Sequence, residues 1–266
     1  MGLCHKVLGM VSVSMTKSIQ RLTQFYADRI RPETFSIRKF VEFASHQVKP
    51  SDLILDAGSG RQQYRKYFSH ARYESTDIDQ LPDCEHDFMC SLDNIPKPDN
   101  TYDAILCTQV LEHVEFPQDV IHECYRVLKP GGMLFLSAPQ GAGVHGEPYH
   151  FFNYTEYGLR SLFKKAGFEV VFIRPNGGVF SSLGKMIQTL PRYISKQYKN
   201  PEIAAKVSLC NRLCWMMMAT LFFFLTPLYK HAVPFLCFYL DSLDKKRFIT
   251  LGYTCYCVKP RFSPLF

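Results

Sequence analysis

The feature that most constrains the fold is a regular alternation of short apolar runs and helical patterns between residues 53 and 175. Strand-like runs lie at 53–57, 73–78, 102–108, 133–139 and 168–175, and helical patterns lie at 62–68, 117–128 and 155–166. Thr155 and Gly167 are suited to cap the last of these helices. Strands that alternate with helices predict a doubly wound, mostly parallel α/β sheet with helices on both faces.

Ligands in such sheets bind beyond the carboxyl ends of the strands, at the point where the strand order reverses. This rule places residues 56–61, 77–79, 87–88 and 108–113 around one crevice. The first of these segments follows a buried strand in LILDAGSGRQQY (53–64), where an acid precedes two glycines spaced two residues apart. We therefore expect a nucleotide or nucleoside site there.

The residues around Gly60 indicate which nucleoside is bound. A dinucleotide-binding loop has a third glycine that lets a helix N-terminus approach a diphosphate. Here Arg61, Gln62, Gln63 and Tyr64 follow instead, and Asp56 would repel phosphates. An acid attracts a cationic amine, so a nucleoside with a positive tail and no phosphate, S-adenosyl-L-methionine, satisfies both conditions. The same facts disfavour a nicotinamide oxidoreductase.

Two further acids support a nucleoside site. Asp77 ends the second strand, 21 residues after Asp56, where an acid can accept hydrogen bonds from ribose hydroxyls. Asp87 offers an acceptor for an adenine amine, and Phe88 offers an aromatic ring beside it. Each residue also has a purely structural interpretation as a turn, a loop cap or a core side chain. Independent turns have no reason to line one crevice, so the set as a whole favours the site.

The ordered series DAGSG, STDID, HDF, YDAILCTQVLEHV, RVLKPGGMLFLSAP and HFFNYTEYGLRSLFKKAGF resembles the class I S-adenosylmethionine-dependent methyltransferases, in their small-molecule, type 11 branch. The resemblance covers about residues 35–175. It implies a Rossmann-like seven-stranded sheet whose last two strands form an antiparallel hairpin. The cofactor-binding residues that it implies are Asp56, Ala57, Gly58, Ser59 and Gly60 at the methionine end, Asp77 and Ile78 at the ribose and adenine face, Asp87 and Phe88 at the adenine edge, and Thr108 and Gln109 beside the sulfonium.

Methyl transfer from a sulfonium is an in-line displacement in which positioning carries most of the catalysis. A hydroxyl acceptor also needs a base, commonly a histidine or a carboxylate. The candidate catalytic residues are Glu112 and His113 after the third strand, and His145 and His150 after the run 133–139. His113 could equally be a structural loop residue, and His150 could pack beside Phe151.

A metal is not expected at this loop. Some quinone-type and RNA-end methyltransferases carry an ExxEH metal motif there, whereas this chain has QVLEH, with Gln109 in place of the first acid. A neutral amide is a poorer ligand for a hard cation than a carboxylate. Glu112, His113 and a later histidine could still bind one.

A long insertion separates the last two predicted strands, 168–175 and 252–260, by about 75 residues. Residues 213–229 within it carry no charge and would form roughly 26 Å of helix, short of the ~30 Å hydrocarbon core. Pro227 and Pro234 interrupt the apolar run. Because the chain must return to the same sheet, a re-entrant hairpin or a pair of interfacial helices is expected.

Basic residues flank this apolar run and suit an anionic lipid surface. They are Lys185, Arg192, Lys196, Lys199, Lys206 and Arg212 before it, and Lys245, Lys246 and Arg247 after it. We therefore expect peripheral or re-entrant membrane contact through about 185–247, on the cytoplasmic side. A helical lid or a dimer interface built on 216–218 and 222–224 is the alternative. No aromatic and basic stacking module for nucleic acid is evident.

These observations divide the chain into an N-terminal helical segment (1–50), a cofactor-binding core (51–175), the insertion (176–250) and a final strand with its tail (251–266). Ten cysteines without zinc-ligand spacing suggest buried thiols in a reducing compartment. The expected function is S-adenosylmethionine-dependent methyl transfer to a small, lipid-soluble or lipid-linked acceptor at a membrane surface. The alternative is a binding or scaffold protein that kept the fold and lost the chemistry.

Overall fold

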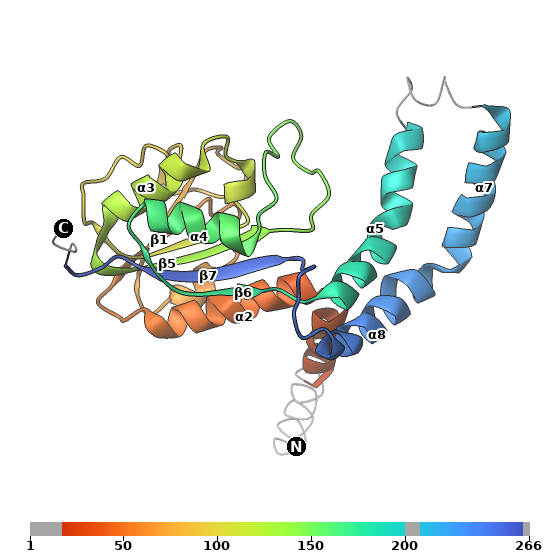
Figure 1. Ribbon diagram of the computed structural model, residues 1–266, viewed down its shortest axis with the longest axis horizontal. Coiled ribbons are helices and arrows are strands. Elements are labelled where there is room, and N and C mark those ends of the chain that lie inside the picture. Colours follow the sequence, from red (N-terminus) through yellow and green to blue (C-terminus); the bar gives the residue numbers. More distant parts are fainter. Residues whose placement is uncertain (1–17, 200–207, 263–266) are drawn as a thin grey trace, which may run out of the picture. The chain divides into compact units, whose positions relative to one another are not determined.

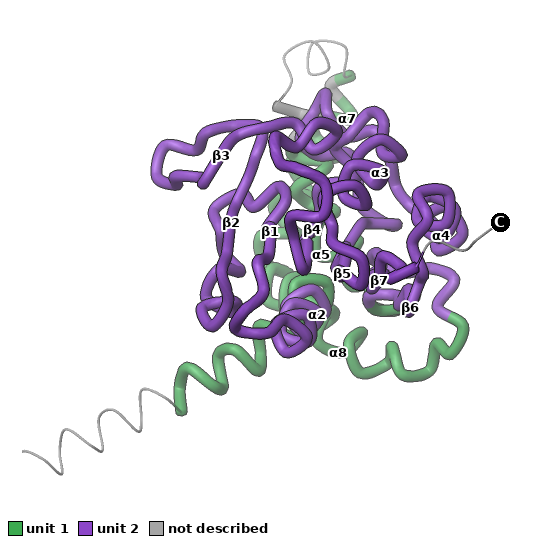
Figure 2. The backbone as a smooth tube through the Cα atoms, turned by 90° about the vertical axis from the view of Figure 1, so that its left-hand side faces the viewer, with its two compact units in different colours: residues 1–35, 177–246 green, residues 36–176, 247–266 purple. Residues whose placement is uncertain are grey.

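The structure is a computed structural model that describes residues 18–199 and 208–262. The chain forms two compact units, coloured separately in Figure 2. Unit 1 comprises Met1–Phe35 and Gly177–Lys246, and unit 2 comprises Ser36–Asn176 and Arg247–Phe266. Lys206 of the predicted basic flank, and residues 1–17 and 263–266 of the predicted terminal segments, lie outside the described residues.

Unit 2 contains a single seven-stranded sheet, as predicted. Its strands are β1 (Leu53–Ala57), β2 (Arg72–Asp77), β3 (Phe88–Met89), β4 (Tyr102–Thr108), β5 (Leu128–Pro139), β6 (Glu169–Pro175) and β7 (Gly252–Val258). They lie in the order β3-β2-β1-β4-β5-β7-β6. β1 to β5 are parallel, and β7 runs antiparallel to both β5 and β6. Because β1 lies between β2 and β4, the winding of the chain reverses beside β1, and a ligand crevice is expected there.

Helices cover both faces of this sheet (Figure 1). α3 (Pro117–Val127) and α4 (Glu156–Lys165) bury Ile121 and Phe163 against one face. Thr155 caps α4, because its side chain accepts a hydrogen bond from the Gly158 N–H. On the other face, α2 (Pro32–Gln47) buries an apolar stripe that includes Phe40 and Val41. This burial explains why residues 36–50, which the sequence assigned to an N-terminal segment, belong to the core unit.

The helix predicted at 62–68 is wrong. Only a short 3₁₀ helix, η1 (Arg65–Phe68), forms there. Gly60 and Gln62 have φ angles of 50° and 51°, in the left-handed region, and the Gln62 N–H bonds to the Ser59 carbonyl in a turn. Left-handed residues interrupt a right-handed helix, so no helix begins directly at the glycine loop. β3 was also not predicted, since two residues are too few for a periodic pattern.

Unit 1 combines the helix at 18–30 with the insertion helices. These are α5 (Val179–Lys199), α7 (Leu209–Phe224), the π-helical turn η3 (Leu228–Ala232), α8 (Val233–Leu240) and the 3₁₀ turn η4 (Asp241–Leu243). Buried Asp241 accepts hydrogen bonds from the N–H groups of Gly178 and Ser181 and so ties the end of α8 to the start of α5. The Arg29 Nε donates to the Tyr239 hydroxyl at 2.7 Å. The N-terminal helix and the insertion therefore form one unit, a contact that the sequence did not predict.

Length and apolar composition together decide whether an insertion helix could cross a membrane. Among the described residues, no single helix combines the length and the apolar composition that a crossing requires. The pair Cys210–Phe224 and Leu228–Leu243 meets both criteria only when taken together, and the two helices are bent by 65° at the break. Pro227 lies within this break.

Candidate active site

The glycine loop after β1 is tied to the end of β2. The N–H groups of Gly58 and Ser59 both donate to the Thr76 carbonyl, at 2.9 and 3.0 Å. The Gly60 N–H donates to Asp77 Oδ2 at 2.8 Å. The structure thus brings the loop 58–60 and Asp77 together at the carboxyl edge of the sheet, where the sequence placed them.

Glycine is required at position 58 for two reasons. Its φ of 73° is left-handed, and an added Cβ would lie 2.4 Å from Cγ2 of Val110. Gly60 is also left-handed, with φ of 50°, but an added Cβ there would meet nothing within 4 Å. Gly58 is therefore required for both steric and conformational reasons, whereas Gly60 is required for its backbone conformation alone.

The variants Gly58→Ala and Gly60→Ala test this difference. A left-handed residue other than glycine costs about 1–2 kcal/mol, and overpacking against a stiff β-branched side chain adds about 1–3 kcal/mol. Gly58→Ala should therefore lower the free energy of unfolding by about 2–5 kcal/mol, whereas Gly60→Ala should lower it by about 1–2 kcal/mol. Urea unfolding measures both values, and equal losses would contradict the close contact with Val110.

The loop is not arranged for a diphosphate. The carboxylate of Asp77 already accepts the Gly60 N–H, and its other oxygen accepts the Ile78 N–H at 2.8 Å. No helix begins directly at the loop, so the dipole of a helix N-terminus is not directed at a ligand there. The side chain of Ile78 is 66 % exposed beside this carboxylate. An exposed apolar side chain can pack on the face of an adenine ring. The acid beside it can accept hydrogen bonds from the ribose hydroxyls of the same nucleoside.

The other predicted cofactor residues lie along the same edge, and several also have structural partners. Asp87 Oδ2 accepts from both the N–H and the hydroxyl of Ser75, at 2.8 Å each. Phe88 is half-buried against the core. Thr108 ends β4, and Gln109, with φ of 56°, donates from Nε2 to the Ser137 hydroxyl at 3.1 Å. These side chains therefore have structural partners, and their roles in cofactor binding stay a prediction.

Sequence reasoning missed two partners of the loop. Asp56 is only 1 % exposed, and the Tyr73 hydroxyl donates a hydrogen bond to Asp56 Oδ2. Burial raises the pKa of Asp56 to about 7, the bond from Tyr73 opposes the rise, and the negative charge of Asp77 adds to it. His86 Nδ1 lies 3.1 Å from the Ser59 hydroxyl. The order of residues along the chain carries no signal for either contact.

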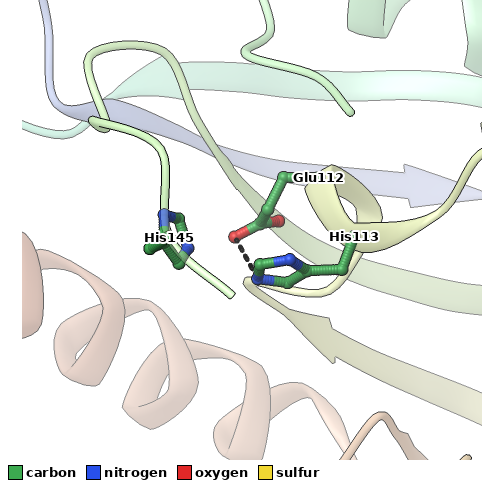
Figure 3. Close-up of side chains that lie close together, drawn as sticks. All are labelled: Glu112, His113 and His145. Atoms are coloured by element: carbon green, nitrogen blue, oxygen red, sulfur yellow. Dashed lines mark ion pairs between the residues drawn. The ribbon is translucent and has the colours of Figure 1, made fainter. Parts of the chain in front are cut away.

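The four candidate catalytic residues come from two loops that are held together. Glu112 and His113 lie in the 3₁₀ turn η2 (Leu111–His113) after β4, and His145 and His150 lie in the loop after β5. The Phe151 N–H donates to the Glu112 carbonyl at 2.8 Å, and the Tyr154 hydroxyl donates to the Leu111 carbonyl at 2.8 Å. Figure 3 shows the side chains of Glu112, His113 and His145 converging. The structure thus brings the predicted set together.

Hydrogen bonds determine which nitrogen of each histidine carries a proton, because a carbonyl oxygen can only accept. His113 Nδ1 contacts the Tyr149 carbonyl and His145 Nδ1 contacts the Gly143 carbonyl, so both rings carry hydrogen on Nδ1. Their Nε2 atoms keep a lone pair in the neutral form. His150 is different, because Nδ1 accepts from the His145 N–H and Nε2 donates to the Phe152 carbonyl. Burial, followed by the nearby charge of His145, lowers the pKa of His150.

Comparison with known proteins agrees with this arrangement. Residues 55–136, from β1 through β5, match the family model described as "Methyltransferase domain". This range contains the glycine loop, Asp77 and the end of β4. This part of the chain is therefore a methyltransferase domain. The cofactor of this family is S-adenosyl-L-methionine.

Curated relatives match part of the chain. A probable S-adenosylmethionine-dependent methyltransferase of Mycolicibacterium smegmatis is 33 % identical over 100 residues, which are 35 % of this chain and 38 % of that protein. A ubiquinone biosynthesis O-methyltransferase of Klebsiella pneumoniae is 53 % identical over 36 residues, which are 14 % of this chain and 15 % of that protein. The chain therefore matches well under half the length of these curated relatives.

A solved structure extends the likeness in fold. A putative sarcosine dimethylglycine methyltransferase from Galdieria sulphuraria has a TM-score of 0.51 and 17 % identity. The match covers 88 % of this chain and 86 % of that one. At this identity the likeness concerns the fold alone, and it confirms the methyltransferase type of sheet.

The raised pKa of Asp56 makes the stability of the protein depend on pH. The folded state holds this proton up to about pH 7, whereas an unfolded chain releases it near 3.8. The stabilising contribution is therefore complete below pH 3.8 and is lost as the pH rises to about 7. Between pH 5 and pH 7 the wild type should lose about 2–3 kcal/mol, at about 1.4 kcal/mol per unit, relative to Asp56→Asn. Urea unfolding at several pH values checks this, and parallel profiles of the two proteins would contradict it.

Proposed function

We propose that the protein transfers a methyl group from S-adenosylmethionine to a small, lipid-soluble or lipid-linked acceptor at a membrane surface. The observation that carries this proposal is the exposure of α7 in a protein that also holds a methyltransferase domain. Six large apolar side chains of α7 are 53–76 % exposed: Leu213, Met216, Met217, Leu221, Phe223 and Phe224. A helix that is apolar on all sides is normally covered by protein or lipid.

The charge of unit 1 supports lipid as the covering. Its two segments hold 14 Lys and Arg against 5 Asp and Glu, whereas unit 2 holds 17 against 19. Each basic residue near an anionic leaflet contributes about 1 kcal/mol of attraction. The bent pair of apolar helices also has the form of a re-entrant or interfacial element. We therefore place the contact at about 185–247, on the cytoplasmic side of a membrane.

The class of acceptor follows from this location. An enzyme held at a lipid surface has access to molecules dissolved in or anchored to it, such as a quinone precursor or a polyprenyl-linked sugar. The short match to ubiquinone biosynthesis O-methyltransferases is in keeping with the first of these. A nucleic acid acceptor, which presents a phosphate backbone, would gain nothing from an exposed apolar helix.

The histidine cluster supplies what a hydroxyl acceptor needs. The Nε2 lone pairs of His113 and His145 can accept a proton, and the carbonyls that hold their Nδ1 atoms orient both rings. Since both nitrogens of His150 are engaged, we assign it to positioning the backbone of His145. Buried Glu112 lies 4.0 Å from His113 Nε2 and would stabilise a proton there.

The test is turnover with a labelled cofactor. Purified protein, radiolabelled S-adenosylmethionine and a membrane extract should give a labelled product that partitions into organic solvent, and cells that lack the protein should lack that product. Labelling confined to the water-soluble fraction would contradict the acceptor class. Cofactor binding without any labelled product from cells or extracts would favour the alternative, a scaffold that kept the methyltransferase fold and lost the chemistry.

A further inference from the structure

We propose that Glu112, His113 and His145 form a binding site for a late first-row divalent cation, of which zinc is the representative. One ligand atom from each residue, a carboxylate oxygen or a ring nitrogen, lies within 4.8 Å of the other two (Figure 3). Two imidazoles and one carboxylate are ligands typical of zinc in catalytic sites. This proposal departs from the expectation of no metal that was based on Gln109.

Gln109 does not decide the question, because it lies outside the cluster. Its amide nitrogen donates to the Ser137 hydroxyl. The third ligand comes instead from His145, 32 residues further along the chain, in the loop after β5. A local motif cannot report a ligand from a different loop.

The tautomers of both histidines are those of metal ligands. A ligating histidine usually donates its second ring N–H to a carbonyl or carboxylate, which fixes the ring and leaves the first nitrogen to the metal. His113 and His145 each donate from Nδ1 to a backbone carbonyl, Tyr149 in one case and Gly143 in the other. Their Nε2 atoms are thereby left as ligands. His150, with both nitrogens engaged, is excluded from the set.

The surrounding loops hold these groups in place. Glu112 is fully buried, and its carbonyl accepts from the Phe151 N–H, so the two loops cannot separate without breaking that bond. Gly146 has a left-handed φ of 64°, and an added Cβ would lie 3.2 Å from the His113 ring. A side chain at this position would therefore have to displace the ring by a few tenths of an ångström, so the glycine lets the backbone pack closely against His113.

Binding requires only a small contraction. Tetrahedral zinc with bonds of about 2.0–2.1 Å brings its ligand atoms to roughly 3.4 Å from one another. Glu112 is buried and His145 is exposed, so the contraction would fall to the His145 side chain. Nitrogen ligands favour zinc, cobalt or nickel over magnesium or calcium. Three protein ligands leave a fourth position on the metal open. An acceptor oxygen would bind at that position, and this consequence rests on the proposed function. The binding of the cation itself does not.

A proton is the competing occupant. Glu112 Oε1 lies 4.0 Å from His113 Nε2. The positive charge that these groups attract can be either an imidazolium proton or a metal cation. A metal site binds one equivalent of the cation, whereas a protonated histidine pair binds none. A direct measurement of metal binding therefore distinguishes the two.

The experiment titrates zinc or cobalt into the chelator-stripped full chain in the absence of cofactor. The background variant is Cys210→Ser with Cys214→Ser, because these exposed cysteines, four apart on α7, could bind zinc themselves. We expect one equivalent of tight binding and an intense visible cobalt spectrum of tetrahedral type. His145→Ala and Glu112→Gln should each weaken binding at least tenfold, whereas His46→Ala, at an exposed histidine in α2, should not.

The outcomes are unambiguous. No stoichiometric binding, or equal binding by His145→Ala, would overturn the site. Glu112→Gln keeps the size of the buried side chain, so its effect does not depend on a folding defect. Methyl transfer is assayed separately with and without added metal: loss of labelled product with metal binding intact would count against the proposed function alone, and the converse against the metal site alone.

Discussion

Replacing Asp77 with alanine is expected to weaken S-adenosylmethionine binding at least 100-fold while the methyltransferase domain stays folded. The Asp77 carboxylate holds the Gly60 and Ile78 N–H groups, and in this family it would also accept the ribose hydroxyls. Charge-assisted hydrogen bonds contribute about 1.5–3 kcal/mol each, so the loss of two exceeds a factor of 100. Isothermal titration calorimetry gives the affinity, and circular dichroism reports the fold.

Asp79→Ala is the matched control. Asp79 is exposed two residues further along and should retain wild-type affinity. Asp77→Asn should lie between the two, because an amide oxygen can still accept the Gly60 N–H but carries no charge. Unchanged affinity in Asp77→Ala would show that the nucleoside site has been placed on the wrong residue.

A triple variant with lysine at Met217, Phe223 and Phe224 is expected to lose the ability to float with anionic liposomes. Inserting these three side chains into the interface would contribute about 5 kcal/mol or more, at about 1.5–3 kcal/mol for each large apolar side chain. The loss corresponds to more than a thousandfold in partition. All three are at least 73 % exposed, so the substitutions should leave the fold of unit 1 intact.

The control is a second triple variant, with lysine at Phe116, Tyr157 and Phe262. It adds the same charge and removes the same number of exposed apolar side chains elsewhere in the protein. These side chains are 61–85 % exposed in unit 2, and the control variant adds the same three positive charges. It should float as the wild type does. The alternative is that a second copy of the chain covers α7. In that case the wild type would not float with liposomes and would sediment as a dimer, and the variant with lysine at 217, 223 and 224 would be monomeric.

Much of the core could be predicted from local patterns. The runs at 102–108 and 133–139 are strands because buried parallel strands are continuously apolar, and Thr155 and Gly167 delimit α4 through cap chemistry. The helix at 62–68 was mispredicted because its polar and aromatic spacing looks helical. The left-handed Gln62 that interrupts it depends on the turn that joins the glycine loop to β2.

The candidate site divides in the same way. Asp77 and the glycines were found because polar residues at the carboxyl ends of parallel strands meet at one edge. Tyr73 as the partner of Asp56, and His86 beside Ser59, were not found, because each contact depends on side-chain direction within the folded sheet.

Patterns along the chain were enough to predict most of the strands and helices, the crevice-lining acids and glycines, and an apolar insertion with basic flanks. These features are local, since periodicity, caps and turns act over a few residues. In contrast, no pattern along the chain predicts that His145 meets Glu112 and His113, or that the N-terminal helix packs with α8. Such contacts join residues that are 32 to 210 positions apart, and the path of the chain between them, rather than any local pattern, brings them together.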